Sequence, residues 1–398
     1  MKVLKIKDIV HTISITHKFD KDKLIAINTS DVENGIMHEG TLTAIKDLKG
    51  QFKKTVQKED ILFSEIRPAN RRFALVTKDD CTDYVVSTKL MVLRKYNNEV
   101  DLRYFYYCLT NQPFLDMLQR KAENRIGSFP QITFDLLSEY AFPVPSLSEQ
   151  EKIANIISSL DHKIELNKQI NDNLEAMAKQ LYDYWFVQFD FPNEEGKPYK
   201  SSGGEMAWNE KLKREIPKGW KSTTLGDECQ MYQPKTLGLS ELDESAIYKV
   251  YGANGVVGKY HTYNHENSEI AMACRGNSCG TINRTVPFSW ITGNAMVIKM
   301  IDDSIHNEYI KQALRYANVN GAISGSGQPQ LTRENLSSIK LCKPTRKLIM
   351  RFSEQVSNIV EMYLQNEANI EELTKQRDDL LPLLMNGQAT VNYHLSDD

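Results

Sequence analysis

Arg, Lys, Asn, Gln, Ser and Gly occur together in several short segments of the chain that have no hydrophobic periodicity. Arg and Lys can hydrogen-bond guanine, Asn and Gln can hydrogen-bond adenine, and small hydroxyl residues with glycine backbone can approach phosphates. The combination indicates contacts with double-stranded DNA, although basic side chains are also common on ordinary solvated loops. The candidates in the first half of the chain are Arg67, Asn70, Arg71, Arg72, Lys121, Arg125 and Ser128. The candidates in the second half are Asn254, Lys259, Arg275, Asn277, Ser278, Asn283, Arg284, Ser326 and Gln328.

Sequence motifs for catalysis or metal binding are missing. The segment GANGVVGK resembles a phosphate-binding loop, but Ala253 stands where the first glycine is needed, and Tyr260 replaces the Ser or Thr that would hold magnesium. No methyltransferase, nucleophile-elbow or HExxH motif occurs, and the eight histidines are scattered. We therefore predict a binding protein with no catalytic residues and no metal site. The cysteines lack the paired spacing of a zinc site, and the expected cytosolic location predicts that they are reduced structural thiols: Cys81, Cys108, Cys229, Cys274, Cys279 and Cys342.

The composition is that of an ordinary soluble protein of two or three domains. The chain has 398 residues, of which 41% are hydrophobic and 25% are charged. It has no apolar run near 18 residues and no signal-peptide pattern at its start, so we expect a cytoplasmic protein with no membrane association. The net charge of −3 does not favour nucleic-acid binding, so a DNA-binding surface depends on local charge.

A long amphipathic segment, residues 145–187, separates the candidate residues of the two halves. Its apolar residues follow coiled-coil spacing, and Ser148 with Glu151 forms a potential capping box after Pro145. A helix of about 39 residues is roughly 58 Å long, which suggests a spacer. The predicted seam consists of Ile153, Ile157, Leu160, Ile164, Asn167, Asn171, Leu174, Ala178, Leu181 and Trp185.

The chain contains an internal repeat with an offset of 199 residues, in which the approaches to two long helices correspond. Pro130, Gln131, Thr133, Leu137, Ser138 and Pro145 recur as Pro329, Gln330, Thr332, Leu336, Ser337 and Pro344. With a small shift, Tyr104 and Leu109 correspond to Tyr309 and Leu314. The predicted order is a globule (1–144), a spacer helix (145–187), a connector (188–220) pinned by Trp208 and Trp220, a globule (221–344), a second spacer helix (345–388) and a tail (389–398).

The repeat predicts an α+β fold in which two pseudo-symmetric globules are separated by an antiparallel pair of long coiled-coil helices. Antiparallel packing lets each helix cover the hydrophobic seam of the other. The midpoints of the two helices fall at Asn167 and Asn366, so these residues are expected to pair and set the register, unless both face solvent. Two such globules could contact two half-sites on one duplex, with the helices as a ruler.

The segments PSLSEQEKIANIISSLDHKIELNKQINDNLEAMAKQLYDYWFVQFDF, GKPYKSSGGEMAWNEKLKREIPKGW and TLGD resemble the specificity subunit of type I restriction-modification systems. The segments FPQIT, QPQLT, YGANGVVGKY and RGNSCGTIN fit the same family. The resemblance covers essentially the whole chain. It departs in the second helix, which lacks the EQ-x-x-IA start and the YWF ending.

The resemblance implies two target-recognition domains, each reading half of a split DNA site, and no catalysis by the chain itself. It also implies binding of two methyltransferase subunits that use S-adenosylmethionine, and of ATP-dependent nuclease and translocase subunits, whose ATP and magnesium are bound by those partners. We expect these partners to dock near Tyr182, Tyr184 and Phe186. The alternatives are a coiled-coil interaction protein without a DNA role and, less favoured because motifs are missing, a stand-alone nuclease or methyltransferase.

Overall fold

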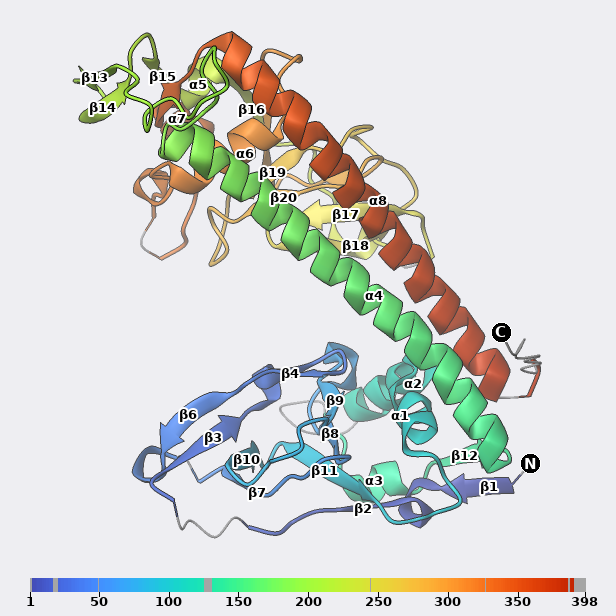
Figure 1. The fold of residues 1–398 in the computed structure, drawn as a ribbon. Coiled ribbons are helices and arrows are strands. Elements are labelled where there is room, and N and C mark those ends of the chain that lie inside the picture. Colours follow the sequence, from blue (N-terminus) through green and yellow to red (C-terminus); the bar gives the residue numbers. More distant parts are fainter. Residues whose placement is uncertain are drawn as a thin grey trace, which may run out of the picture. The chain divides into compact units, whose positions relative to one another are not determined.

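The computed structural model describes residues 2–16, 21–48, 50–124, 131–243, 245–325, 327–385 and 387–389. The chain divides into two compact units. The first consists of Met1–Ile164 and Glu371–Asp398, and the second of Glu165–Ile370. Each unit contains a globule of helices and sheets together with part of both long helices (Figure 1).

The globule of the first unit contains two four-stranded sheets, in the orders β2-β11-β8-β9 and β6-β3-β10-β7, and two strand pairs, β1-β12 and β4-β5. Its strands are β1 (Lys2–Lys5), β2 (Val10–Thr12), β3 (Lys23–Ile27), β4 (Val32–Glu33), β5 (Ile36–Met37), β6 (Thr41–Ala44), β7 (Phe52–Lys54), β8 (Ile61–Ser64), β9 (Phe73–Leu75), β10 (Tyr84–Ser87), β11 (Leu90–Lys95) and β12 (Ala141–Val144). Its helices are α1 (Leu102–Thr110), α2 (Gln112–Glu123), α3 (Phe134–Ser138) and the short turns η1 (Ile6–Asp8), η2 (Thr29–Asp31), η3 (Ile45–Asp47) and η4 (Pro68–Asn70).

The globule of the second unit contains a four-stranded sheet, β16-β22-β19-β20, a three-stranded sheet, β18-β17-β21, and the pairs β13-β14 and β15-β23. Its strands are β13 (Met206–Asn209), β14 (Arg214–Pro217), β15 (Lys221–Thr224), β16 (Cys229–Tyr232), β17 (Tyr248–Gly252), β18 (Gly255–Tyr260), β19 (Ile270–Ala273), β20 (Ile282–Arg284), β21 (Trp290–Ile291), β22 (Ala295–Met300) and β23 (Lys340–Lys343). Its helices are α5 (Leu225–Glu228), α6 (Glu308–Tyr316), α7 (Arg333–Ser337) and the turns η6 (Leu239–Glu241) and η7 (Asn320–Ala322).

The two globules share the strand order of their main sheets, except that the first has the additional edge strand β7, and this shared order confirms the predicted repeat and extends it to the sheets. The order β2-β11-β8-β9 corresponds to β16-β22-β19-β20, and β6-β3-β10 corresponds to β18-β17-β21. The sheets β6-β3-β10-β7 and β18-β17-β21 each contain one parallel pair, β3 with β10 and β17 with β21. In each globule an early strand pairs antiparallel with the strand that precedes a long helix, β1 with β12 and β15 with β23.

Two tyrosines that the sequence repeat aligned occupy equivalent positions. The Tyr104 hydroxyl donates a hydrogen bond to the carbonyl of Pro143 at 2.8 Å, and the Tyr309 hydroxyl donates to the carbonyl of Cys342 at 3.5 Å. Burial raises the pKa of both phenols, so they remain donors. Each bond ties one helix of a globule, α1 or α6, to the strand that leads into a long helix.

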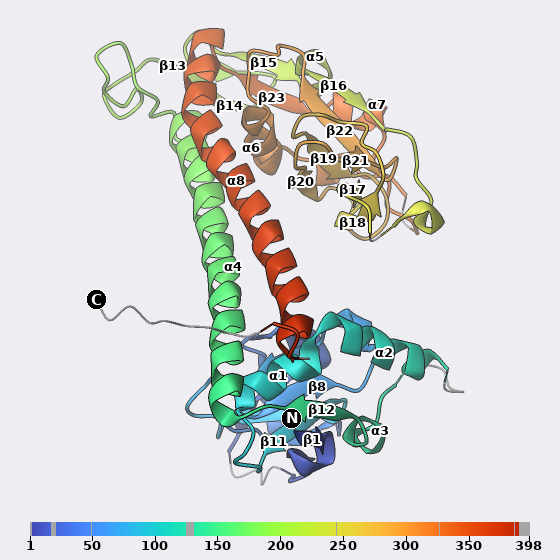
Figure 2. The ribbon, with the colours of Figure 1, turned by 90° about the vertical axis from the view of Figure 1, so that its right-hand side faces the viewer.

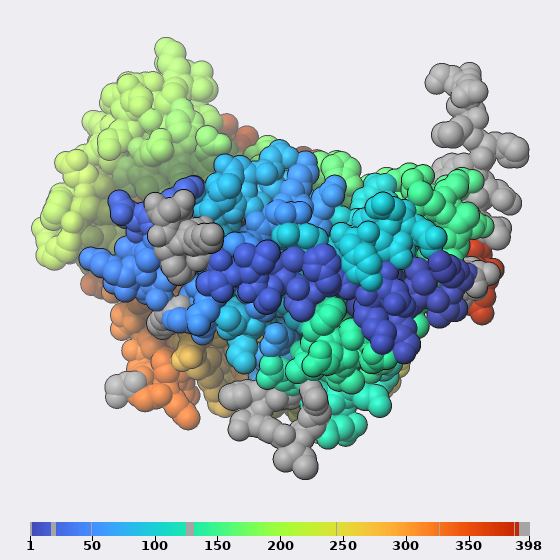
Figure 3. Space-filling view, turned by 90° about the horizontal axis from the view of Figure 1, so that it is seen from below, coloured from blue at the N-terminus to red at the C-terminus, as the bar shows by residue number. Residues whose placement is uncertain are grey.

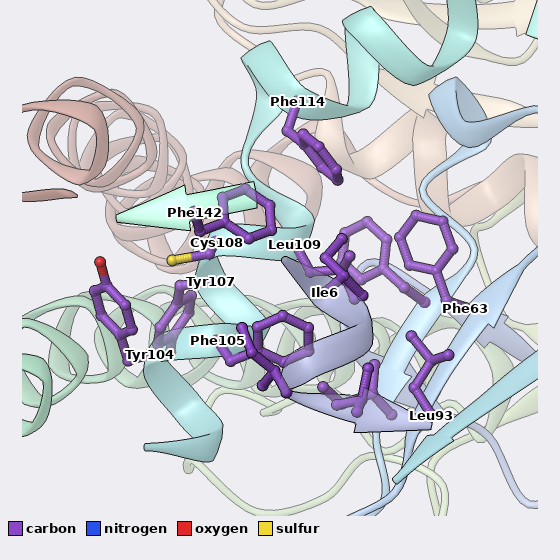
Figure 4. Close-up of a cluster of buried hydrophobic side chains, with 14 of the residues drawn as sticks. Ile6, Phe63, Leu93, Tyr104, Phe105, Tyr107, Cys108, Leu109, Phe114 and Phe142 are labelled. Atoms are coloured by element: carbon purple, nitrogen blue, oxygen red, sulfur yellow. The ribbon is translucent and has the colours of Figure 1, made fainter. Parts of the chain in front are cut away.

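The central strands of the first unit are buried on both faces. Ile61, Phe63 and Leu93 belong to one core cluster, whereas Leu62 and Val92 belong to another. The division follows the two-residue period of a strand, because successive side chains point to opposite faces of the sheet. Figure 4 shows aromatic side chains of α1 packed in the first cluster. Strand β1 lies at the surface, where the N-terminal residues form a dark blue band in Figure 3.

The chain contains two long helices. The first is α4 (Leu147–Tyr182), which continues as the π-helical turn η5 (Asp183–Val187), and the second is α8 (Arg346–Met385). The seam predicted for the first helix is confirmed. Buried seam residues are Ile153, Ile157, Leu160, Ile164, Asn171, Leu174, Ala178 and Trp185, and Asn167 and Leu181 are partly buried.

The start of α4 is two residues earlier than the predicted capping box of Ser148 and Glu151. Ser146 and Glu149 form the box instead, with the Ser146 N–H donating to Glu149 Oε2 at 3.0 Å and the Glu149 N–H donating to Ser146 Oγ at 3.4 Å. Pro145 ends the preceding extended segment, so the next residue with a hydroxyl side chain takes the cap position.

In the first unit, the last turns of α8 pack antiparallel to the first turns of α4, side by side in both ribbon views (Figure 1 and Figure 2). Leu381 and Leu384 share a core cluster with Ile157. Arg377 Nη1 donates to Asp161 Oδ1 at 2.9 Å. The core of the first globule is thus completed by residues from the far end of the sequence.

In the second unit, the last turns of α4 pack antiparallel to the first turns of α8. Trp185 contacts Phe352, with ring centroids 6.0 Å apart, and both belong to the core cluster of this unit. Toward the middle of the helices, Asn171 Nδ2 donates to Glu367 Oε1 at 2.8 Å. In both units, therefore, the last turns of one long helix pack antiparallel to the first turns of the other.

The register of the helix pair is shifted from the predicted pairing of Asn167 with Asn366. The described bonds across the helices join Asn171 to Glu367 and Asp161 to Arg377. In antiparallel helices with the two residues of each pair opposite each other, Asn167 and Asn366 are about five residues out of step, which is roughly 7.5 Å along the axis. The midpoints of two helices do not fix their register, because the register is set by the side chains that pack between them.

The predicted connector, residues 188–220, contains the hairpin of β13 and β14. Trp220 is buried and stacks against Phe191 with ring centroids 5.3 Å apart, as expected for a residue that pins the segment. Trp208 is 58% exposed, so the same expectation was wrong for this residue.

Replacing Asn171 and Glu367 by alanine, singly and together, tests the register. We expect a coupling energy of about 0.5–1.5 kcal/mol in urea denaturation, because the two side chains share one partly buried hydrogen bond. The control is the same cycle at Asn167 and Asn366, for which we expect coupling below about 0.3 kcal/mol. Stronger coupling in the control cycle would contradict the observed register.

Candidate nucleic-acid interface

Most of the exposed candidate residues lie on one equivalent loop of each globule. In the first unit this loop, residues 66–72, joins β8 to β9 through η4. In the second unit it comprises residues 275–281 and joins β19 to β20. We name these two segments the reading loops.

The two reading loops share one turn-closing backbone hydrogen bond although their sequences differ. The Asn70 N–H donates to the carbonyl of Arg67 at 2.8 Å, and the Cys279 N–H donates to the carbonyl of Gly276 at 3.0 Å. The turn therefore has the same form in both units. The side chains that it presents are different.

Each reading loop is held by a second segment that belongs to the recurring Pro-Gln-x-Thr motif. The Ile132 N–H donates to the carbonyl of Glu65 at 2.7 Å, and the Leu331 N–H donates to the carbonyl of Cys274 at 3.0 Å. We name residues 131–132 and 330–331 the bracing segments. Their β-bridges pair Ile66 with Gln131 and Arg275 with Gln330.

In the first unit, the exposed candidates lie together on the first reading loop and the adjacent helix. Arg67 and Asn70 are exposed on the loop, and Lys121 is exposed on α2. Helix α2 packs against η4, and Gln119 Oε1 of α2 accepts a hydrogen bond from the Ala69 N–H at 3.2 Å. Basic and amide groups thus share one surface, as base and phosphate contacts require.

The structure assigns Arg71 and Arg72 to structural contacts instead of the predicted DNA contacts. Arg71 Nε donates to Asn34 Oδ1 at 2.8 Å, and its Nη1 donates to Gln112. Arg72 Nη1 lies 3.3 Å from Glu33 Oε2. Burial lowers the pKa of Arg71. Both side chains fold inward because the β4-β5 hairpin carries acceptors next to the loop, which the sequence spacing could not reveal.

In the second unit, Arg275, Asn277 and Gln328 are exposed and Ser278 is half-buried. The Gly276 N–H donates to the carbonyl of Pro329 at 3.0 Å, which brings the second reading loop next to the loop that carries Gln328. These candidates therefore form one surface.

Four other candidates of the second half lie away from this surface, on strands or their turns. Asn254 is exposed at the turn between β17 and β18, and Lys259 is half-buried on β18. Asn283 is half-buried on β20, next to Arg284.

Arg284 is buried, so the prediction that it contacts DNA is wrong. Its guanidinium pairs with the Glu308 carboxylate, and the two side chains are only 3% and 1% exposed. Burial by itself would raise the pKa of Glu308, but the positive charges of Arg284 and Lys311 outweigh burial and lower it. Lys311 extends the network to Glu175 of α4. This network fastens β20 and α6 to the long helix.

Three candidates, Arg125, Ser128 and Ser326, lie outside the described residues.

The predicted docking residues Tyr182 and Phe186 belong to the core of the second unit. Both are buried, and the Phe186 ring lies 5.1 Å from the ring of Phe352, centroid to centroid. The end of α4 enters the core because the start of α8 presents aromatic and aliphatic side chains opposite it. Tyr184 is 38% exposed and remains available on the outer face.

A polar cluster under the first reading loop was missed from the sequence. Gln131 Nε2 donates to Glu65 Oε2 at 2.8 Å, and Lys54 Nζ lies 4.0 Å from Glu65 Oε1. Lys54 also donates to the carbonyl of Leu90 at 2.7 Å, and burial lowers the pKa of its amine. The recurrence of Gln131 as Gln330 was the one sequence signal that pointed to this region.

All six cysteines are free thiols, as predicted, and burial raises the pKa of several, including Cys108 and Cys229 to about 12. In the described part of the chain, no cluster of three or more His, Cys, Asp and Glu side chains could hold a metal ion.

Among the helices that the structure describes, none has the length and apolar composition needed to cross a membrane.

The fold is that of a duplicated α+β protein with two braced loops that expose basic and amide side chains. The sequence model of the family described as the type I restriction modification DNA specificity domain matches residues 1–176 and 217–372. The chain therefore belongs to the family of type I restriction-modification DNA specificity proteins, and the resemblance found in its helix and connector is confirmed.

Known relatives agree with this assignment. The chain is 29% identical to the type I restriction enzyme HindI specificity subunit of Haemophilus influenzae, over 94% of this chain and 97% of that protein. It is 27% identical to the MjaIX specificity subunit of Methanocaldococcus jannaschii, over 72% of this chain and 69% of that protein. A crystal structure of the type I system S subunit from M. genitalium has a similar fold, with a TM-score of 0.53, 19% identity and 96% coverage of both chains.

Arg284→Ala is expected to destabilise the second unit by about 3 kcal/mol, because it leaves the buried Glu308 carboxylate without its main partner. The matched control is Arg275→Ala, in which an exposed arginine of the same unit is removed and a change within about 0.5 kcal/mol is expected. Urea denaturation followed by tryptophan fluorescence measures this unit alone, since all four tryptophans lie in it. Equal effects of the two changes would contradict the assignment.

Acid should destabilise the second unit through His306. Burial, followed by the charge of Arg284, lowers the pKa of this imidazole from its usual 6.5 to about 4, and Nδ1 accepts a hydrogen bond from the Glu308 N–H. Because the unfolded chain binds the proton first, stability is lost as the pH falls from 6.5 to 4, by about 2 kcal/mol for an incompletely buried ring.

The substitution His306→Asn keeps an acceptor and does not titrate, so it should flatten this part of the stability profile. His261→Asn is the control, because the His261 side chain is 66% exposed. A profile unchanged by His306→Asn would contradict the role of this residue.

Proposed function

We propose that this chain reads a bipartite DNA site, with one half contacted by each reading loop. The observation that carries the proposal is the repetition of one braced turn in two globules with different exposed side chains. A shared backbone frame with different side chains suits two half-sites of different sequence. Arg and Lys would hold phosphates, and Arg, Asn and Gln would contact base edges in the major groove.

The long helices are the proposed spacer between the two half-sites. Helix α4 is continuous over 36 residues, a length of about 54 Å, and its residues belong to both units. A continuous hydrogen-bonded helix resists bending, so it can keep a fixed spacing. This property would make the separation of the two half-sites as specific as their sequences.

The chain is proposed to act without catalysis of its own, as a scaffold for two methyltransferase subunits and for nuclease and translocase subunits. Membership of the specificity family supports this role. S-adenosylmethionine, ATP and magnesium would be bound by those partners. Of the predicted docking residues, Tyr184 is the one that is exposed and can contact a partner.

Mapping of methylated adenines in a host that carries this chain and its methyltransferase subunits tests the proposal. We expect one bipartite motif that disappears when the chain is deleted. Replacing Arg275 and Asn277 by alanine should relax one half of the motif, because these exposed side chains lie on only one of the two reading loops.

The matched control is Lys221→Ala, which removes an exposed charge on β15. It should leave the motif unchanged. Methylation that does not depend on the chain would favour a coiled-coil interaction protein without a DNA role, and a motif without two halves would contradict the bipartite site.

A further inference from the structure

The two reading loops turn at the same two positions, but they use different residues there. In the second loop these positions are Gly276 and Gly280, with φ of 75° and 92°. In the first loop the equivalent positions, 209 residues earlier, are Arg67 and Arg71, with φ of 46° and 53°. Left-handed backbone is easy for glycine and unfavourable for residues with a Cβ atom. The first loop therefore contains two strained arginines where glycine would fit.

The strain at Arg71 has a structural compensation. Its side chain donates to Asn34 and Gln112, and its guanidinium lies 5.6 Å from the centre of the Phe73 ring. The carbonyl of Arg71 also accepts a hydrogen bond from the Asn34 N–H at 2.8 Å. These contacts hold the β4-β5 hairpin and the start of α2 against the first reading loop.

Arg67 has no such compensation in the described residues. Its side chain is exposed, and none of the described side-chain hydrogen bonds or ion pairs includes it. A residue in a sparsely populated backbone conformation persists only where surrounding structure holds it, and such residues cluster at functional sites. An unpartnered, strained arginine is therefore unexplained by the stability of the fold.

The backbone on either side of Arg67 is firmly held. The Ile66 N–H donates to Ser64 Oγ at 3.1 Å, and Pro68 is buried. The Ala69 N–H donates to Gln119 of α2 at 3.2 Å. The loop consequently presents the Arg67 side chain from a fixed backbone, which reduces the entropy lost when its guanidinium binds a partner.

Space does not explain the difference between the two loops. A Cβ atom added to Gly276 would meet no atom within 4 Å, so a side chain could be accommodated there. The second loop nevertheless has the unstrained residue at this position. The first reading loop thus has an arginine side chain at a position where the second reading loop has none.

We propose that Arg67 is a specificity-determining residue that reads a guanine in the half-site contacted by the first unit. The proposal rests on the proposed function of the chain. Its planar fork can donate two parallel hydrogen bonds to the O6 and N7 atoms of guanine in the major groove. Lysine carries the same charge without the fork, so the two residues are distinguishable.

The test uses the full chain with its methyltransferase subunits in cells, and reads the methylated-adenine motif. Arg67→Gly should remove the preference for one G·C pair in one half, by roughly 5- to 150-fold, and leave the other half intact. Arg67→Lys should lose the same preference. Arg67→Asn, which tolerates the left-handed conformation, provides a second variant in case the glycine variant is poorly folded.

Thermal unfolding of the purified chain supplies the second measurement. Arg67→Gly should leave the melting temperature unchanged or raise it, because strain is relieved. Arg71→Gly is the matched control at the other strained position. It should lower the melting temperature by removing the contacts to Asn34 and Gln112.

An unchanged motif in both Arg67→Gly and Arg67→Asn would overturn the proposal, as would wild-type base preference in Arg67→Lys. Relaxation of the half that also responds to Arg275→Ala with Asn277→Ala would overturn it too, and so would a uniform loss of methylation at every site. If the unmodified chain directs no bipartite motif, the proposed function itself fails and this inference with it. The two failures are therefore distinguishable.

Discussion

The hydrophobic seams of the two long helices are the constraint on which the rest of the structure depends. A single amphipathic helix of this length would expose its seam, so each helix is covered by the other and by the globules. Leu381 and Leu384 of α8 complete the core of the first unit, and Trp185 and Phe186 of η5, the turn that continues α4, complete the core of the second. Neither globule is fully packed by its own stretch of sequence. Each unit therefore needs residues from both long helices to complete its core, although each has its own sheets.

The two globules have a similar backbone at their reading loops but expose different side chains there. The frame consists of the turn of each reading loop, its backbone hydrogen bonds and the bracing segment that follows the recurring motif. On this frame the first unit presents Arg67 and Asn70, and the second presents Arg275 and Asn277. A rigid backbone limits the entropy lost on binding, and the difference in side chains allows two different DNA half-sites. The duplicated topology thus provides one backbone frame on which two different sets of side chains are exposed.

Arginine illustrates how far residue type alone can support a functional assignment. Arg67, Arg71 and Arg284 all occur in segments of similar composition, yet the structure gives them different environments. Arg67 is exposed, Arg71 is fastened to Asn34 and Gln112, and Arg284 is buried against Glu308. The same guanidinium group can read a base, hold a hairpin or form a buried ion pair. Its partners, which lie tens of residues away in sequence, decide among these roles.

The amino-acid sequence alone determined the repeat, the long helices, the buried seam and the family, because periodicity, helix-capping residues and recurring motifs are local properties of a chain. It also located the reading loops through their mixture of basic, amide and small residues. Only the tertiary structure decided the helix register, the burial of Tyr182 and Phe186, and which arginines face solvent. These features depend on contacts between segments far apart in sequence, whose geometry is set by packing. The left-handed backbone of Arg67, likewise invisible in the sequence, emerged only when its position could be compared with that of Gly276.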